Sequence, residues 1–132
     1  MHRRLVTFLL LLTVVGCSAS APEYQAIAPP QDAWFAENVT SQSVPVIVDF
    51  TATWCGPCRG LKPLLEQLET EYAGKVIVLP IDVDARKDLA THYKVNAYPM
   101  LLMMQSGKVV DICRGAPPTY EDLKSWALSH LK

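Results

Sequence analysis

The sequence predicts an α/β domain with a central mixed β-sheet and helices on both of its faces. Two runs rich in β-branched apolar residues, over residues 44–50 and 75–81, have the composition of buried strands. A long amphipathic helical pattern separates them, and a hairpin pattern and a last helix follow. Strands that alternate with helices and then close with a hairpin give a mixed sheet covered on both sides.

Length and composition restrict the class of protein. The 132 residues suffice for one compact domain, and no internal repeat is visible. Hydrophobic residues make up 50% of the chain and charged residues 19%, as in folded globular domains. The formal net charge is -1 and the basic residues form no stripe, so we expect no nucleic-acid partner.

The first half of the domain contains three expected elements. Asp32 is suited to cap a short helix over residues 33–39. The strand over residues 44–50 leads into a helical pattern over residues 55–72, in which leucines recur at helical spacing. Pro63 lies inside this pattern and should kink the helix.

The strand over residues 75–81 begins the second half. Because proline cannot donate to a ladder, we expect Pro80 at the end of this strand or in a bulge. A short helix is expected over residues 84–93. Residues 100–104 and 108–113 flank a Ser-Gly pair and predict a hairpin, and a helix over residues 119–131 closes the domain.

The N-terminal residues read as a targeting signal. A basic segment precedes an apolar run over residues 5–15, which is too short for a membrane-spanning helix. The run ends in Val14-Val15-Gly16-Cys17, which resembles the lipobox of bacterial lipoproteins. That resemblance implies a signal peptide over residues 1–16 and a lipid on Cys17; the alternatives are an ordinary cleaved signal and an uncleaved anchor.

Residues 17–30 are expected to tether the domain. Small residues and three prolines predict a flexible spacer, in which residues 24–28 could form a short edge strand. The predicted location is the bacterial cell envelope, lipid-anchored and facing the periplasm, a compartment in which disulfides persist. In enterobacterial lipoproteins a residue such as Ser18 after the lipidated cysteine favours the outer membrane.

Cys55 and Cys58 carry the predicted chemistry. They are separated by Gly56 and Pro57 at the start of a helix, whose free N–H groups and dipole stabilise a thiolate and lower the pKa of Cys55. The thiolate is the attacking species in disulfide exchange, so Cys55 at the exposed end should attack first and Cys58 should resolve the mixed disulfide. Half of a zinc site is the alternative, but there is no second C-x-x-C and we predict no metal.

Beyond this motif the chain resembles the thioredoxin family. The run Val46-Ile47-Val48-Asp49-Phe50 leads into Trp54-Cys55-Gly56-Pro57-Cys58-Arg59, and Pro63, Ile81-Asp82, Tyr98-Pro99 and Gly115 follow in the family's order. The likeness spans residues 31–132 and implies the thioredoxin fold.

The resemblance also implies roles for individual residues. Pro99 corresponds to the cis-proline that faces the cysteines, although a proline that merely starts a strand is the alternative. The backbone of Tyr98 would pair with the substrate chain. The apolar substrate-docking surface implied by the family consists of Trp54, Gly56, Pro57, Ile81, Tyr98, Pro99, Gly115 and Ala116.

Asp49 is expected to be the third catalytic residue. An ionised carboxylate is costly in an apolar strand, so Asp49 should be protonated or linked to water. In thioredoxins this residue exchanges the proton of the second cysteine. The lysine that pairs with it in many relatives falls, by this alignment, at Val78. Cys113 is expected to be a buried, inert thiol or else a regulatory one, and His92 and His130 to lie on solvated helix faces.

Three functions remain open on the sequence. The first is a protein-disulfide reductase acting on exported proteins, favoured by the Gly-Pro pair between the cysteines. The second is an oxidase that inserts disulfides, and the third is a non-catalytic binding subunit or chaperone. No nicotinamide or flavin motif occurs, so we expect no cofactor beyond the Cys55–Cys58 disulfide and an electron supply from another protein. The resemblance implies that this donor is a membrane thiol protein. We expect the protein itself to be a monomer.

Overall fold

The computed structural model describes residues 22–131. Its four strands are β1 (Val46–Thr51), β2 (Ile77–Asp82), β3 (Met100–Gln105) and β4 (Lys108–Arg114), in the sheet order β2–β1–β3–β4. β1 runs parallel to β2 and antiparallel to β3, and β3 runs antiparallel to β4. The predicted mixed sheet is therefore confirmed.

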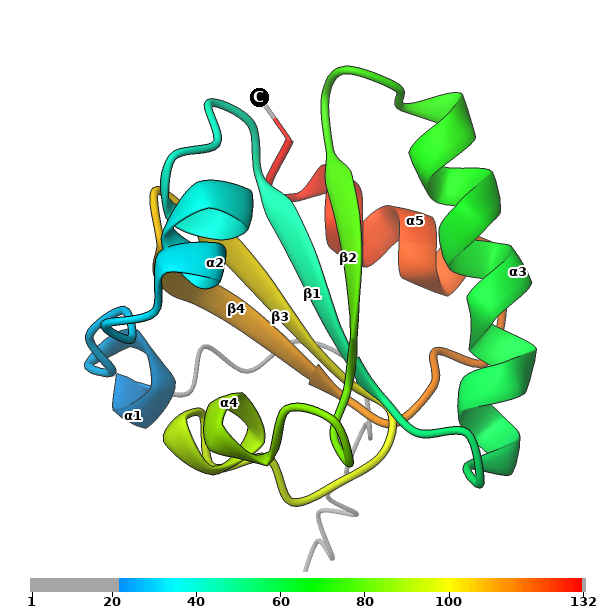
Figure 1. Ribbon diagram of the computed structural model, residues 1–132. Coiled ribbons are helices and arrows are strands. Elements are labelled where there is room, and N and C mark those ends of the chain that lie inside the picture. The colour runs from blue at the N-terminus through cyan, green and yellow to red at the C-terminus, as the bar shows by residue number, and fades with distance from the viewer. Residues whose placement is uncertain (1–21, 132) are drawn as a thin grey trace, which may run out of the picture.

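Helices cover both faces of the sheet, as predicted (Figure 1). One face carries the two longest described helices and the other carries shorter helical segments. The first group is α3 (Gly56–Glu71) and α5 (Tyr120–Leu128); the second is α2 (Ala33–Phe35), the π-helical turn η1 (Ala36–Thr40) and α4 (Lys87–His92).

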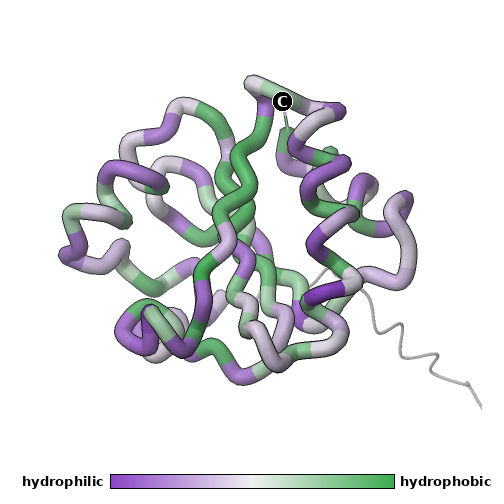
Figure 2. Tube along the Cα trace, turned by 45° about the vertical axis from the view of Figure 1, so that its right-hand side comes forward, coloured by the Kyte–Doolittle hydropathy of each residue, from purple (hydrophilic) through white to green (hydrophobic). Residues whose placement is uncertain are grey.

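The two central strands are buried on both faces. All residues of β1 except its last one are buried, and so are the first five residues of β3. Figure 2 shows hydrophobic stretches along the strands, with hydrophilic positions more frequent in the helices and loops around them. The strand pleat divides these side chains between two hydrophobic clusters, one under each layer of helices. Asp49 belongs by this alternation to the face covered by α3.

The prediction for β2 was wrong in two respects. β2 is an edge strand and most of its residues are only partly buried, whereas the sequence predicted a buried strand. Pro80 lies inside β2 and pairs in register with Asp49, neither at the strand end nor in a bulge. An edge strand tolerates this proline because the missing N–H can fall on the side that has no neighbouring strand.

Local sequence signals set the ends of the remaining elements. α3 continues through Pro63 to Glu71, and Gly74 beyond it adopts a left-handed φ of 78°. The capping box at the start of α5 is present, with the hydroxyl of Thr119 accepting from the N–H of Asp122. The predicted Ser-Gly turn joins β3 to β4.

α4 starts later than predicted. The sequence placed its start at residue 84, but it begins at Lys87. The carboxylate of Asp82 accepts hydrogen bonds from the N–H groups of Asp84 at 2.8 Å and of Ala85 at 3.4 Å. These bonds hold the segment in a turn and delay the helix.

The edge strand predicted for residues 24–28 was also wrong. The chain forms a short helix there, α1 (Pro22–Gln25), which packs beside β4. Tyr24 is 2% exposed and its hydroxyl donates to the carbonyl of Lys94 at 3.3 Å. Tyr24, and the partly buried Ile27, therefore pack against the domain although the segment around them is mostly exposed.

The two histidines expected on solvated helix faces both make specific contacts; that of His92 on α4 is exposed to solvent, whereas His130 lies beyond the end of α5. His92 Nε2 lies 2.8 Å from the carbonyl oxygen of Ala28, and His130 Nε2 lies 2.8 Å from Asp111 Oδ2. Asp111 is buried and also accepts from the indole N–H of Trp126 at 3.0 Å. The sequence missed this network because its members come from β4 and from the C-terminal end of the chain.

No helix among residues 22–131 combines the length and apolar character needed to cross a bilayer. The predicted signal peptide and the lipid acceptor Cys17 lie outside the described residues.

Candidate active site

The two motif cysteines lie at the N-terminus of α3 and form a disulfide. Cys55 is the N-cap residue with extended backbone (ψ 111°), and the Cα atoms of Cys55 and Cys58 are 5.3 Å apart. The N–H of Cys58 points back and donates to Cys55 Sγ at 3.3 Å. A helix N–H that has no carbonyl partner within the helix and the positive end of the helix dipole therefore face the first sulfur, an arrangement that stabilises a thiolate after reduction.

Both cysteines are largely buried in this disulfide form. Cys55, expected at the exposed end, is 5% exposed and Cys58 is 3% exposed. The exposed surface beside them belongs to neighbouring residues, because Trp54 is 61% exposed and Gly56 and Pro57 are also exposed. A substrate would therefore meet this rim before it reaches the sulfur of Cys55.

Trp54 and Tyr98 meet on this rim although 44 positions separate their numbers in the sequence. Their rings pack edge to face with centroids 5.5 Å apart. The indole N–H of Trp54 donates to Asp84 Oδ2 at 2.8 Å, which fixes the ring over the loop after β2. Asp84 was not among the predicted site residues, because nothing in its local sequence indicates a contact with Trp54.

The Tyr98–Pro99 peptide bond is cis, as the resemblance implied. Pro99 is buried at the start of β3, and its carbonyl accepts from the N–H of Gly115 at 2.8 Å. The structure thus brings Gly115, with exposed Ala116 beside it, next to Pro99. It does not bring Ile81 to the rim, because Ile81 is 2% exposed and packs in the core.

Asp49 lies on the central strand β1, behind the cysteines. Its side chain is buried, with 5% of the residue exposed, and its Oδ1 atom has no hydrogen-bond partner among the described residues. Burial raises the pKa of Asp49 from 3.8 to about 6, because desolvation penalises the charged carboxylate. A carboxyl group with this pKa can both hold and release a proton near neutral pH.

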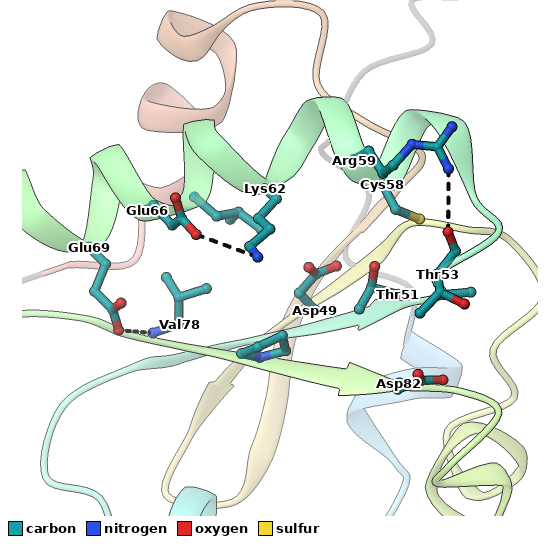
Figure 3. Close-up of a pocket in the computed structure, with 13 residues that line it drawn as sticks. Asp49, Thr51, Thr53, Cys58, Arg59, Lys62, Glu66, Glu69, Val78 and Asp82 are labelled. Atoms are coloured by element: carbon teal, nitrogen blue, oxygen red, sulfur yellow. Dashed lines mark hydrogen bonds and ion pairs between the residues drawn. The ribbon is translucent and has the colours of Figure 1, made fainter.

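Asp49 and Cys58 line the same groove, which we call the Asp49 groove (Figure 3). It has a volume of about 540 Å³ and lies between α3 and the paired strands β1 and β2. The Asp49 carboxyl and the Cys58 sulfur therefore border one cavity. The groove residues are Asp49, Thr51, Ala52, Thr53, Cys58, Arg59, Lys62, Leu65, Glu66, Glu69, Val78, Pro80 and Asp82.

The register of β1 and β2 shows which β2 residues lie near Asp49. Pro80 is the residue paired with Asp49, whereas Val78 pairs with Ile47. Val78 is two positions away on the same face of β2 and lines the same groove, so a long side chain at either position could reach Asp49. Neither residue is charged, so the expectation that β2 offers Asp49 no lysine holds for both positions.

Sequence reasoning also missed Lys62, which lines the groove opposite β2. Its position four residues after Cys58 puts both side chains on one face of α3, which is a signal that could have identified it. Cys113 is buried in the cluster under α3 and α5. Among residues 22–131 no group of three or more His, Cys, Asp or Glu side chains could hold a metal ion.

Comparison with known proteins agrees with this geometry. The sequence model of the Thioredoxin family matches residues 26–129. The chain is 40% identical over 93 residues to a thioredoxin of Synechocystis sp., a match that covers 69% of this chain and 87% of that protein. It is 44% identical over 84 residues to thioredoxin C-2 of Corynebacterium nephridii, covering 64% of this chain and 78% of that protein. Mitochondrial thioredoxin of Bos taurus is 46% identical over 77 residues, covering 58% and 46% respectively.

The fold, the C-x-x-C disulfide at a helix N-terminus and these relatives define a thiol–disulfide oxidoreductase. Within that class the chain belongs to the thioredoxin family. Its redox group is the Cys55–Cys58 disulfide.

Proposed function

We propose that this thioredoxin reduces disulfides of exported proteins at the bacterial cell envelope, held there by a lipid on Cys17. The observation that carries the reductase chemistry is the hydrogen bond from the N–H of Cys58 to Cys55 Sγ at the start of α3. The Gly-Pro pair between the cysteines supports the reducing direction. The apolar run before the lipobox-like Cys17 supports the location.

The first step is attack on the substrate. In the reduced protein the Cys55 thiolate attacks one sulfur of a substrate disulfide, so a bond from Cys55 to that sulfur forms as the substrate S–S bond breaks. The displaced substrate sulfur leaves as a thiolate and takes a proton from solvent. The exposed rim of Trp54, Tyr98 and Ala116 would receive the substrate chain.

The second step releases the product. The Cys58 thiol gives its proton to the Asp49 carboxylate, and the Cys58 thiolate attacks Cys55 Sγ. The Cys55–Cys58 bond forms, the mixed disulfide breaks, and the second substrate sulfur leaves as a thiolate that solvent protonates. Two electrons have then passed from the cysteine pair to the substrate. A membrane thiol donor would return them.

An insulin-reduction assay tests the activity. The wild-type protein should precipitate the insulin B chain with dithiothreitol as donor, and Cys55→Ser should not. Ser43→Ala, at an exposed position outside the C-x-x-C motif, is the control for a single substitution. Equal activity of wild type and Cys55→Ser, or none in either, would favour a binding role instead.

The direction of transfer is tested by the redox potential of the Cys55–Cys58 pair. A reductase should equilibrate with glutathione near the value of about -270 mV that is typical of thioredoxins. A value near -120 mV, as in strongly oxidising members of the superfamily, would favour the oxidase. Cys58→Ser should trap substrates on Cys55 as mixed disulfides, and their identity tests whether they are exported proteins.

Location and the role of Asp49 are tested separately. Cys17→Ser should move the protein from the membrane fraction to the soluble fraction, and a variant that still sediments with membranes would contradict lipidation. Asp49→Asn should slow resolution of the mixed disulfide more than the first attack. Equal slowing of both steps would contradict a proton-transfer role.

A further inference from the structure

The Asp49 groove lacks a cation on its strand side. The residue beside Asp49 on β2 is Pro80, and the other β2 side chain near the middle of the groove is that of Val78. Both are uncharged, so no side chain at these two positions can stabilise an ionised Asp49. The opposite wall, formed by α3, carries a lysine.

Lys62 extends from α3 toward the strands on the side of Asp49 (Figure 3). It stands four residues after Cys58, so its side chain leaves the helix on the same face as the second cysteine. Lys62, Cys58 and Asp49 therefore border one cavity.

The present ion pair of Lys62 is weak. Its Nζ lies 3.9 Å from Glu66 Oε1, and the two side chains are 76% and 65% exposed. Exposed pairs of this kind contribute little, because water screens the charges and two flexible side chains must be ordered. The ammonium group can therefore leave Glu66 and move across the mouth of the groove.

Asp49 needs such a partner whenever it is ionised. Its Oδ1 atom is buried without a hydrogen bond, and a buried carboxylate is stabilised by a nearby opposite charge. The other cation of the groove, Arg59, has its guanidinium on the carbonyl of Thr53 at 3.3 Å. The titratable and charged groups around Asp49 are Cys58, Arg59, Lys62, Glu66 and Glu69 from α3 and Asp82 from β2.

The acidic side chains around Asp49 make contacts of their own. Glu69 Oε1 accepts from the backbone N–H of Val78 at 2.9 Å, which holds it at the far end of β2. Glu66 competes with Asp49 for the lysine, and Asp82 accepts from the turn that follows β2. Of the two cations that line the groove, Lys62 is thus the one whose present contact is weak enough to let it move toward Asp49.

We propose that Lys62 is a positioning residue for disulfide exchange, whose ammonium group approaches the Asp49 carboxylate and keeps it ionised and ready to accept the proton of Cys58. This inference rests on the proton-acceptor role proposed for Asp49. The cation comes from the helix that carries the cysteines, not from the neighbouring strand.

Nuclear magnetic resonance titration of the Asp49 side-chain carboxyl carbon tests the contact without any substrate. Removing a cation disfavours the carboxylate, so Lys62→Gln should raise the pKa of Asp49 by roughly half a unit or more. Lys62→Arg should restore most of the wild-type value. Lys87→Gln is the control, since Lys87 lies on α4 across the sheet and should leave the pKa unchanged.

A kinetic measurement tests the consequence. The rate of mixed-disulfide resolution in Lys62→Gln should follow a pH profile moved to higher pH by the same amount, which is about a threefold loss well below the midpoint. The rate of first attack by Cys55 should change much less. A purely structural role of Lys62 would change neither the carboxyl titration nor the midpoint of the profile.

The results for Asp49→Asn and Lys62→Gln together distinguish a failure of the Lys62 inference from a failure of the proposed role of Asp49. If Asp49→Asn slows resolution but Lys62→Gln leaves both the pKa of Asp49 and the pH profile unchanged, the lysine contact is refuted and the role of Asp49 stands. If Asp49→Asn has no effect on resolution, the proton-acceptor role fails and the inference fails with it. A raised pKa, a shifted profile and rescue by arginine together support it.

Discussion

Replacing Asp49 by asparagine should stabilise the folded protein near neutral pH and change its stability little in acid. Burial raises the pKa of Asp49 from 3.8 to about 6 in the folded state. The difference of about 2 units corresponds to roughly 3 kcal/mol between the folded and unfolded chains. Because the residue is 5% exposed, solvent screening reduces this value little.

The contribution of Asp49 to stability decreases as the pH rises, because the folded protein holds the Asp49 proton more tightly than the unfolded chain does. Below the ordinary pKa of 3.8 Asp49 is neutral in both states and burial of charge costs nothing. As the pH rises from there to about 6, the unfolded chain releases this proton while the folded chain keeps it, so stability falls. Above the folded pKa the loss is complete and the contribution levels off. Asparagine has no such titration.

Urea unfolding of the disulfide form between about pH 4 and pH 8 measures this effect. The free energy of unfolding of Asp49→Asn minus that of wild type should grow from near zero in acid to as much as roughly 3 kcal/mol at pH 8. Glu37→Gln, at an exposed carboxylate, is the control for loss of one negative charge. A difference that is the same at every pH would refute the reasoning.

Three further predictions concern the scaffold, each measured by urea unfolding. Gly107→Ala should cost roughly 2 kcal/mol, because φ is 76° there and an added Cβ would lie 2.7 Å from Thr40 Oγ1; an unchanged midpoint would contradict the close approach. Asp111→Ala should cost about 3 kcal/mol, since it leaves the buried indole N–H of Trp126 without an acceptor, and Asp111→Asn should recover part of it. If residues 22–30 belong to the fold, Tyr24→Ala should lower the free energy of unfolding by about 3 kcal/mol and Tyr24→Phe by less than about 1 kcal/mol. An unchanged stability of Tyr24→Ala would show that this segment is part of the flexible spacer.

Elements with local signals were predicted well from the sequence. The Ser-Gly pair specifies its turn because Ser106 and Gly107 both adopt positive φ, which glycine in particular tolerates. The capping box of α5 depends on two side chains three residues apart, Thr119 and Asp122. In such features the interacting residues are close in the sequence, so no tertiary information is needed to predict them.

Features that depend on distant partners could not be predicted in the same way. The pattern of residues 75–81 identifies a strand but does not tell an edge strand from a central one, because that depends on what pairs beside it. The helix around Tyr24 is held by a hydrogen bond to Lys94, 70 positions away. Likewise, only the strand register places Pro80 beside Asp49.

The same burial that lowers stability gives Asp49 its chemical use. A carboxyl group on the protein surface would have a pKa near 4 and would be a poor acceptor for a thiol proton at neutral pH. In the apolar strand β1 its pKa rises to about 6, which brings it closer to that of a thiol. Full compensation of this charge by a fixed cation on β2 would lower the pKa again. The approach of Lys62 that we propose would stabilise the Asp49 carboxylate only in part, because Lys62 is exposed to solvent on α3, so the carboxyl group would keep a raised pKa suited to proton transfer.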